Sequence, residues 1–345
     1  SAYAAVLYEP VSGTVLFEKN SREVLPVAST TKIMTALLAF ESEHRGDPVT
    51  ITPEMISVEG SSMGLRAGEM LALGDIARGM MMASGNDGAN AIALYLSDST
   101  EAFSEKMNAR AAELHMMQTH FVTPSGLDAE GHGSTAYDMA LLAAEAMQNE
   151  EFAAAVGQTT LSVPFISPEK TVRYENHNRL LKLYPDCTGI KTGFTKKAGR
   201  CLVSSAERDG ARLICVTLNA PDDWNDHIAL LDDAFSRYSE VTLHEKGDTL
   251  AQTQVFGGET DRAELVAEST VTAYLLPGEQ DRLRRVRYGE KFCYAPVVRA
   301  AAAGTVEYRL GDAVIASDRL KYGGEVLLAQ EKRGLLDRLR QRLAG

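Results

Sequence analysis

The sequence lacks several features that would point to particular classes of protein. It contains no apolar run of the roughly 18 or more residues that a membrane-spanning helix needs. Basic residues are outnumbered by acidic ones, 35 to 47, which gives a formal net charge of −12 over 345 residues. Nucleic-acid binders carry a basic stripe instead. We therefore expect no membrane-spanning helix and no nucleic-acid partner.

Cysteine is also scarce, with four residues at positions 187, 201, 215 and 293. None is in CxxC spacing and no histidine cluster lies beside them, so the sequence predicts neither a zinc site nor a disulfide framework. Buried free thiols are the interpretation that composition favours. If Asp209-Gly210 forms a two-residue turn, Ser204 rather than Cys201 faces Cys215.

The chain opens on a β-rich run, without the charged and then apolar segments of a signal peptide. We expect that it begins just after a removed leader or at a trimmed N-terminus.

The order of predicted elements indicates an α+β domain over residues 1–239. β-rich runs flank a turn cluster near the N-terminus, and a nearly all-apolar helix follows Pro26. Helical patterns then fill the middle of the chain, before β-signals return from residue 187. The expected strands are 3–8, 14–18, 187–195, 201–207 and 211–219, and the expected helices are 73–97 with a break at 84–86, 100–117, 137–148 and 226–238. We expect an antiparallel sheet built from both ends of this domain and covered by the helices between them.

Helical periodicity ends at about residue 240. Short β-runs at 251–256, 265–274, 305–310 and 325–328 alternate with glycine, proline and charged turns. This texture predicts a small all-β domain over residues 240–331. Residues 332–345 form a separate tail.

Three short motifs carry the residues most suited to chemistry, and the first pairs Ser29 with Lys32. Ser29 stands where the apolar helix begins, and Lys32 follows one turn later on the same face. Serine needs an adjacent base to act as a nucleophile, and lysine is a base only when burial or a nearby cation lowers its pKa. The apolar helix supplies burial. A capping serine and a solvent-directed lysine are the alternative.

The second motif is Ser84-Gly85-Asn86, at a break between helices, and the third is Lys191-Thr192-Gly193, in a predicted strand. The second offers a hydroxyl and an amide. The third offers an ammonium, a hydroxyl and a glycine, Gly193, whose missing side chain lets a substrate backbone approach. Taken singly, each motif also fits helix capping or a plain edge strand.

Together, in this order and setting, the motifs resemble the SxxK, SxN and KTG set of the penicillin-recognising serine enzymes. Finer detail resembles the D-alanyl-D-alanine carboxypeptidases, the low-molecular-mass penicillin-binding proteins of peptidase family S11. The stretches that carry this likeness are LPVASTTKIMTALLA, SGNDGANAIA, FVTPSGLDAEGHGSTAYDMALL, NHNRLL and GIKTGFT. The likeness covers residues 3–240 closely and the β-rich remainder in position and texture. It implies a β-lactamase/transpeptidase-like sheet followed by that family's second domain.

The resemblance implies a serine enzyme that removes the terminal D-alanine from peptidoglycan stem peptides, needs no cofactor or metal, and is acylated by β-lactams. It assigns the acylated nucleophile to Ser29 and the general base to Lys32. Ser84 would relay a proton, and Asn86 would bond the substrate amide.

The same resemblance places substrate-binding groups on the third motif. Lys191 and Thr192 would hold the substrate carboxylate or polarise the cleft. The backbone N–H groups of Ser29 and Phe194 would form an oxyanion hole. Ser61-Ser62-Met63 resembles a loop that borders the cleft, and is a weaker candidate.

Two departures from the family pattern concern substrate binding. Phe194 stands where related enzymes often carry histidine, and residues 221–227 lack the arginine that helps some relatives grip the terminal carboxylate. Arg200 or His227 could assist in that role, or neither. We expect Trp224, the single tryptophan, to be a packing residue, because tryptophan is mostly buried.

Two other functions fit parts of the pattern. A class A-like β-lactamase would need a carboxylate to activate the deacylating water, and Asp128 and Glu130 lie in the loop after Phe121. A β-lactam sensor or binding module would keep the fold without turnover. The carboxypeptidase-like surroundings of that loop and the added β domain favour the peptidase.

The tail, residues 333–345, places four leucines on one helical arc with arginines outside it. Such a helix can lie on a membrane surface or pack on the β domain. The family resemblance favours the membrane, and it implies an extracytoplasmic enzyme on the outer face of the cytoplasmic membrane.

Overall fold

The computed structural model describes residues 1–11 and 13–329. The chain divides into two compact units between Ser236 and Arg237. Residues 333–345, for which we predict an amphipathic helix, lie outside the described residues.

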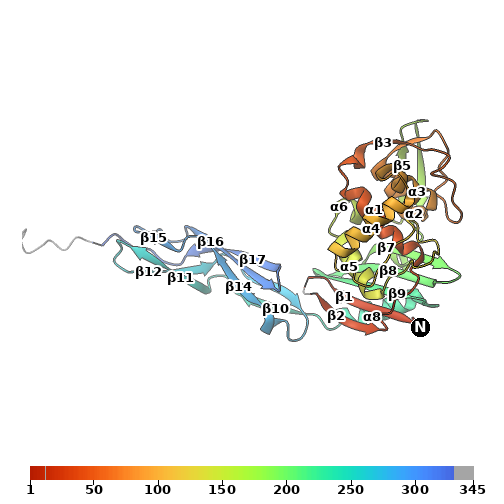
Figure 1. The fold of residues 1–345 in the computed structure, drawn as a ribbon. Helices are drawn as coiled ribbons and strands as arrows, with labels where there is room; N and C mark the ends of the chain where they lie inside the picture. The colour runs from red at the N-terminus through yellow and green to blue at the C-terminus, as the bar shows by residue number, and fades with distance from the viewer. Residues whose placement is uncertain (12, 330–345) are drawn as a thin grey trace, which may run out of the picture. The chain divides into compact units, whose positions relative to one another are not determined.

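The first unit is built on a five-stranded antiparallel sheet whose strands come from both ends of the unit (Figure 1). In spatial order the strands are β2 (Thr14–Lys19), β1 (Ala4–Glu9), β9 (Ala211–Leu218), β8 (Gly199–Arg208) and β7 (Cys187–Thr195). The predicted sheet is thereby confirmed. The turn at Asp209-Gly210 joins β8 to β9, and Ser204 pairs with Cys215 as that turn predicts.

Helices cover both faces of this sheet, and β1 is buried along its whole length. On one face α5 contacts β1 and β9, where the rings of Tyr8 and Tyr137 meet edge to face with centroids 6.2 Å apart. On the other face α8 contacts β8 and β9. The helices of this unit are α1 (Lys32–Glu41), α2 (Leu73–Ala83), α3 (Asn86–Leu96), α4 (Thr100–Glu113), α5 (Ala136–Ala146), α6 (Glu150–Val156), α7 (Leu180–Leu183) and α8 (Asp223–Phe235).

Helix α1 lies at the centre of the helical layer and contacts α2, α3, α5 and α6. Its apolar side chains are therefore buried almost all round, as the sequence predicts. A short 3-10 turn, Ala28–Thr31, precedes it and carries Ser29. No side chain caps this turn or α1, so the capping role that Ser29 could have filled is absent and its hydroxyl is free for other contacts.

Two small hairpins complete the first unit: β3 (Pro48–Thr50) with β4 (Met70–Ala72), and β5 (Thr160–Phe165) with β6 (Lys170–Glu175). The sequence predicts no strand between residues 148 and 187. The pair β5–β6 buries only the few side chains that face α2, such as Val163 and Tyr174. Its charged outer face and Pro164 weaken the strand signal.

The second unit contains strands and one 3-10 turn, Gln280–Arg282, within the residues that the structure describes. A six-stranded sheet has the order β14 (Arg284–Tyr288), β16 (Ala302–Leu310), β17 (Ala313–Tyr322), β12 (Arg262–Ala267), β11 (Thr249–Phe256) and β15 (Phe292–Tyr294). A separate pair joins β10 (Ser239–His244) to β13 (Val271–Leu275). The single run expected at 265–274 is wrong, because residues 268–270 separate β12 from β13.

No helix in the described part of the chain is long and apolar enough to cross a membrane.

Candidate active site

The first and third motifs meet where the turn carrying Ser29 lies against strand β7. A Cβ on Gly193 would lie 3.1 Å from the backbone nitrogens of Ser29 and Thr30. A side chain at this position would be crowded, and the strand or the turn would have to shift by a few tenths of an ångström. Glycine therefore favours the close approach of the two backbones.

The amine of Lys32 lies 2.9 Å from Ser29 Oγ and donates to the backbone carbonyl of Ser125 at 2.7 Å. The lysine is fully buried. Burial, reinforced by the positive charge of Lys191, holds the pKa of Lys32 well below its ordinary value, although Asp87 opposes this shift. A neutral amine beside a hydroxyl is the arrangement that general-base activation of serine requires.

A second buried lysine, Lys191 on β7, links the third motif to the second. Its amine donates to Ser84 Oγ at 3.0 Å and to the carbonyl of Thr192 at 2.8 Å. Burial lowers the pKa of Lys191 to about 7. The Ser84 hydroxyl is therefore hydrogen-bonded to an amine whose pKa lies near neutral pH.

Ser84 ends α2 with a left-handed backbone, at φ +56°. This conformation is unfavourable for a residue with a side chain, and such residues concentrate at functional sites. Gly85 follows in a crowded position, where a Cβ would lie 2.7 Å from the nitrogen of Met63. The side chain of Asn86 donates to the carbonyl of Glu59 at 2.6 Å, and it does not line the cleft.

The loop that carries Ser61, Ser62 and Met63 is tied to α3 through the buried carboxylate of Asp87. That carboxylate accepts from Ser62 Oγ at 2.6 Å and from the backbone nitrogen of Met63 at 2.9 Å. Ser61 itself lines the cleft. The loop therefore borders the site, as expected, and Asp87 fixes its position.

A cleft of about 370 Å³ lies beside these residues. Its lining includes the predicted residues Ser29, Ser84, Thr192, Gly193 and Phe194. The side chain of Phe194 is 66% exposed. Three lining residues for which no role is predicted from the sequence are His177, Arg179 and Asp223. The segment NHNRLL supplies two of them and was identified by family likeness alone.

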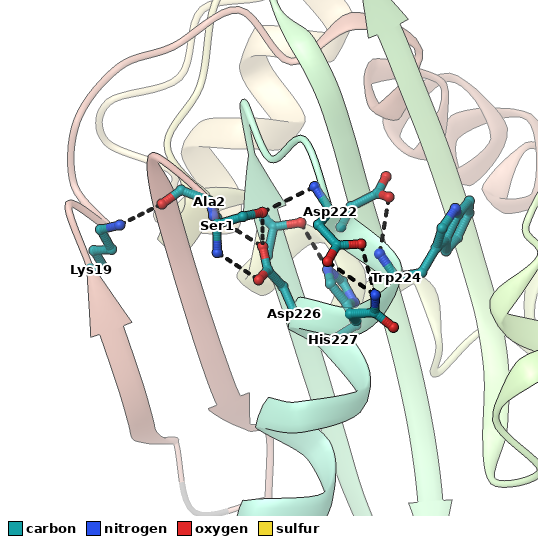
Figure 2. A network of polar contacts seen from close by, with 10 residues as sticks. Ser1, Ala2, Lys19, Asp222, Trp224, Asp226 and His227 are labelled. Atoms are coloured by element: carbon teal, nitrogen blue, oxygen red, sulfur yellow. Dashed lines mark hydrogen bonds and ion pairs between the residues drawn. The ribbon is translucent and has the colours of Figure 1, made fainter.

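Trp224 is not the packing residue that we expected. It is half-buried and lines the cleft. Figure 2 shows it projecting from the first turn of α8, away from the neighbouring polar network in which Asp226 binds the Ser1 amine at 2.6 Å. Trp224 lines the cleft because it lies in the first turn of α8, next to Asp223, which also lines the cleft.

Arg200 is the basic side chain that stands beside Trp224 in the cleft. Its guanidinium lies 5.4 Å from the centroid of the Trp224 ring and donates to Asp223 Oδ1 at 2.7 Å. His227, the other residue considered for carboxylate binding, is fully buried between Ser204 and Thr217. Burial lowers the pKa of His227 to about 3, so it remains neutral and outside the cleft.

The carboxylates considered for a β-lactamase mechanism lie outside the cleft. Asp128 accepts from Thr195 Oγ1 at 3.1 Å, and Glu130 is exposed. Among the described lining residues the one carboxylate is Asp223, which is paired with Arg200. Within the same part of the chain, no three His, Cys, Asp or Glu residues gather as a metal site.

A serine beside a buried lysine, with a second serine–lysine pair across the cleft, defines a serine hydrolase of the acyl-transfer type. Comparisons with known proteins specify the family. The profile of the D-alanyl-D-alanine carboxypeptidase family S11 matches residues 1–222, and that of the penicillin-binding protein 5 C-terminal domain matches residues 238–328. The chain belongs to the D-alanyl-D-alanine carboxypeptidases of family S11.

Individual relatives agree with this assignment. D-alanyl-D-alanine carboxypeptidase DacF of Bacillus subtilis is 35% identical, over 91% of this chain and 83% of its own length. DacC of Escherichia coli is 33% identical, over 90% and 80%. The crystal structure of penicillin-binding protein 5 from Haemophilus influenzae superposes with a TM-score of 0.65 at 27% identity, covering 94% of this chain and 97% of that one.

Proposed function

We propose that this enzyme removes the terminal D-alanine from peptidoglycan stem peptides through an acyl-enzyme on Ser29. The observation that carries the proposal is the buried Lys32 amine, 2.9 Å from Ser29 Oγ. Its hydrogen-bond partners in the described structure are Ser29 and the carbonyl of Ser125. Burial without an ion-pair partner lowers the pKa of an amine, which makes the neutral form that accepts the serine proton more accessible.

In the acylation step, Lys32 takes the proton as Ser29 Oγ attacks the carbonyl of the penultimate D-alanine. The backbone N–H groups of Ser29 and Phe194 stabilise the oxyanion, a contribution of about 3–4 kcal/mol in comparable sites. The C–N bond then breaks, and Ser84 passes a proton to the departing D-alanine amine. Water hydrolyses the ester and restores Ser29.

Substrate binding falls to the remaining cleft residues. Thr192 and Arg200 receive the terminal carboxylate, because both line the cleft and Arg200 supplies the positive charge that residues 221–227 do not. Asp223 and Trp224 hold the guanidinium in place. Lys191 polarises the cleft through Ser84. Asn86 donates to the Glu59 carbonyl and is assigned to holding the loop that contains Glu59, in place of the substrate contact that the family resemblance implies.

The test is release of D-alanine from a diacyl-L-Lys-D-Ala-D-Ala peptide, together with covalent labelling by a fluorescent penicillin. We expect both activities in the natural enzyme and neither in Ser29→Ala. Rapid turnover of penicillin would indicate a β-lactamase, and stable labelling without D-alanine release would indicate a sensor. Covalent labelling of Ser29→Ala would show that the nucleophile is another residue.

We also propose that the enzyme acts outside the cytoplasmic membrane and contacts the membrane surface through residues 333–345. The support is the sequence of that segment, with leucines on one helical arc and arginines around it. Deleting it should abolish flotation with anionic vesicles and leave D-alanine release from a soluble peptide unchanged. Equal flotation of the intact and shortened proteins would refute the proposal.

A further inference from the structure

The segment 122–127 packs directly against the turn that carries the proposed nucleophile. Its Ser125 carbonyl accepts from the Lys32 amine at 2.7 Å. Gly126 has φ +81°, and a Cβ there would lie 1.9 Å from the carbonyl oxygen of Ala28. The position of this segment therefore determines where the Ser125 carbonyl lies relative to the Lys32 amine.

His132 connects this segment to the turn. Its Nδ1 accepts from the backbone nitrogen of Val122 at 2.9 Å, and its Nε2 lies 2.9 Å from Thr31 Oγ1. A backbone N–H can only donate, so Nδ1 carries no proton and the neutral ring has its proton on Nε2. The ring therefore donates to Thr31, the residue directly before Lys32.

The orientation of the amine matters because a neutral amine has two N–H donors and a single lone pair. Donation of one N–H to the Ser125 carbonyl restricts the rotation of the amine, so that either its lone pair or its second N–H faces Ser29 Oγ, 2.9 Å away. A displaced carbonyl would release that rotation. Thr35, one turn further along α1, donates through Oγ1 to the neighbouring carbonyl of Pro124 at 2.6 Å.

We propose that His132 is a positioning residue for the general base: it fixes the Ser125 carbonyl relative to the Ser29–Lys32 turn and so orients the Lys32 amine. This inference rests on the proposed function of Lys32.

The ring must stay neutral for this role, since a proton on Nδ1 would face the N–H of Val122. Burial lowers the pKa of His132 to about 4, with His120 and Lys197 reinforcing the shift and Asp128 opposing it. His132 therefore stays neutral throughout the range in which the enzyme is expected to work.

The test compares His132→Ala with His132→Gln, whose amide can accept from Val122 and donate to Thr31. A misplacement of about 1 Å in a catalytic group can lower the rate by about 10²-fold. We expect kcat for D-alanine release by His132→Ala to fall by about that factor with KM nearly unchanged, and His132→Gln to recover at least about tenfold. His120→Gln, on an exposed histidine of the same region, should behave like the natural enzyme.

A pH profile separates positioning from loss of folded protein. A carbonyl acceptor stabilises the ammonium form, so its displacement should lower the pKa of Lys32 further. The acid limb of kcat/KM should then move to lower pH in His132→Ala, whereas a merely destabilised enzyme would fail earlier on acidification. Rates are expressed per site that a fluorescent penicillin labels, which removes inactive protein from the comparison.

Unchanged kcat in His132→Ala, an unmoved acid limb, or His132→Gln no better than His132→Ala would overturn the inference. If His132→Ala does not fold, the single variants His132→Gln and Thr31→Val test the inference in its place. Thr31→Val removes the acceptor of the His132 hydrogen bond and should lower kcat without changing KM. Absence of D-alanine release and labelling in the natural enzyme would refute the proposed function instead.

Discussion

Replacement of Lys191 by methionine should stabilise the first unit while abolishing its activity. Lys191 is 2% exposed, and burial lowers its pKa to about 7. In the unfolded chain a lysine has a pKa of about 10.4. The pKa of Lys191 is therefore more than three units lower in the folded state than in the unfolded state.

The size of the effect follows from linkage. Each unit of pKa difference corresponds to about 1.36 kcal/mol, so burial of Lys191 costs about 4 kcal/mol of folding free energy at neutral pH. Methionine has a similar length and no charge. Its loss of the bonds to Ser84 and Thr192 subtracts about 1 kcal/mol each. We expect a net gain of about 2 kcal/mol in the free energy of unfolding.

The pH dependence of the free energy of unfolding shows whether this linkage operates. Between about pH 7 and about pH 10.4 the unfolded state binds more protons at this residue than the folded state, so stability rises with pH in the natural enzyme. In Lys191→Met this contribution disappears. The variant should therefore be more stable than the natural enzyme at neutral pH and less stable above about pH 10.4, where only the loss of the two hydrogen bonds remains.

Urea unfolding followed by tryptophan fluorescence measures this directly. Trp224 is the only tryptophan of the sequence, so the signal reports the first unit alone. Lys196→Met, on an exposed lysine just after β7, is the matched control and should change neither stability nor slope. A Lys191→Met protein that is less stable at neutral pH, with the natural pH slope, would refute the reasoning.

The remaining predictions concern catalysis. Lys32→Ala should bind penicillin but lose at least about 10²-fold in acylation rate, as loss of a general base typically does; an unchanged rate would reject that role. In the natural enzyme, acylation should fall as pH drops through the lowered pKa of Lys32, measured as a pH–rate profile. Arg200→Gln should raise KM for the peptide about tenfold, the loss of one charge-assisted bond, with Arg212→Gln as control; an equal KM would place the carboxylate elsewhere. Dialysis against a chelator should leave D-alanine release intact, and loss restored by zinc would contradict this.

Local patterns in the sequence determined much of the first unit. Asp209-Gly210 between two apolar runs specified a hairpin, and its length fixed Ser204 opposite Cys215, as the structure confirms. The apolar helix after Ser29 predicted a central α1. These features depend on neighbours within a few residues, and such interactions are readable from one chain segment.

The tertiary structure decided what those segments meet. The lowered pKa of Lys191, the place of Trp224 in the cleft, and the contact of His132 with Thr31 all join residues from different elements. No periodicity encodes them, because burial and long-range contact depend on how the sheet and helices close around one another. The motifs Ser29–Lys32 and Lys191–Gly193 could therefore be identified from the sequence. The closeness of their backbones, which favours glycine at position 193, is a property of the folded chain.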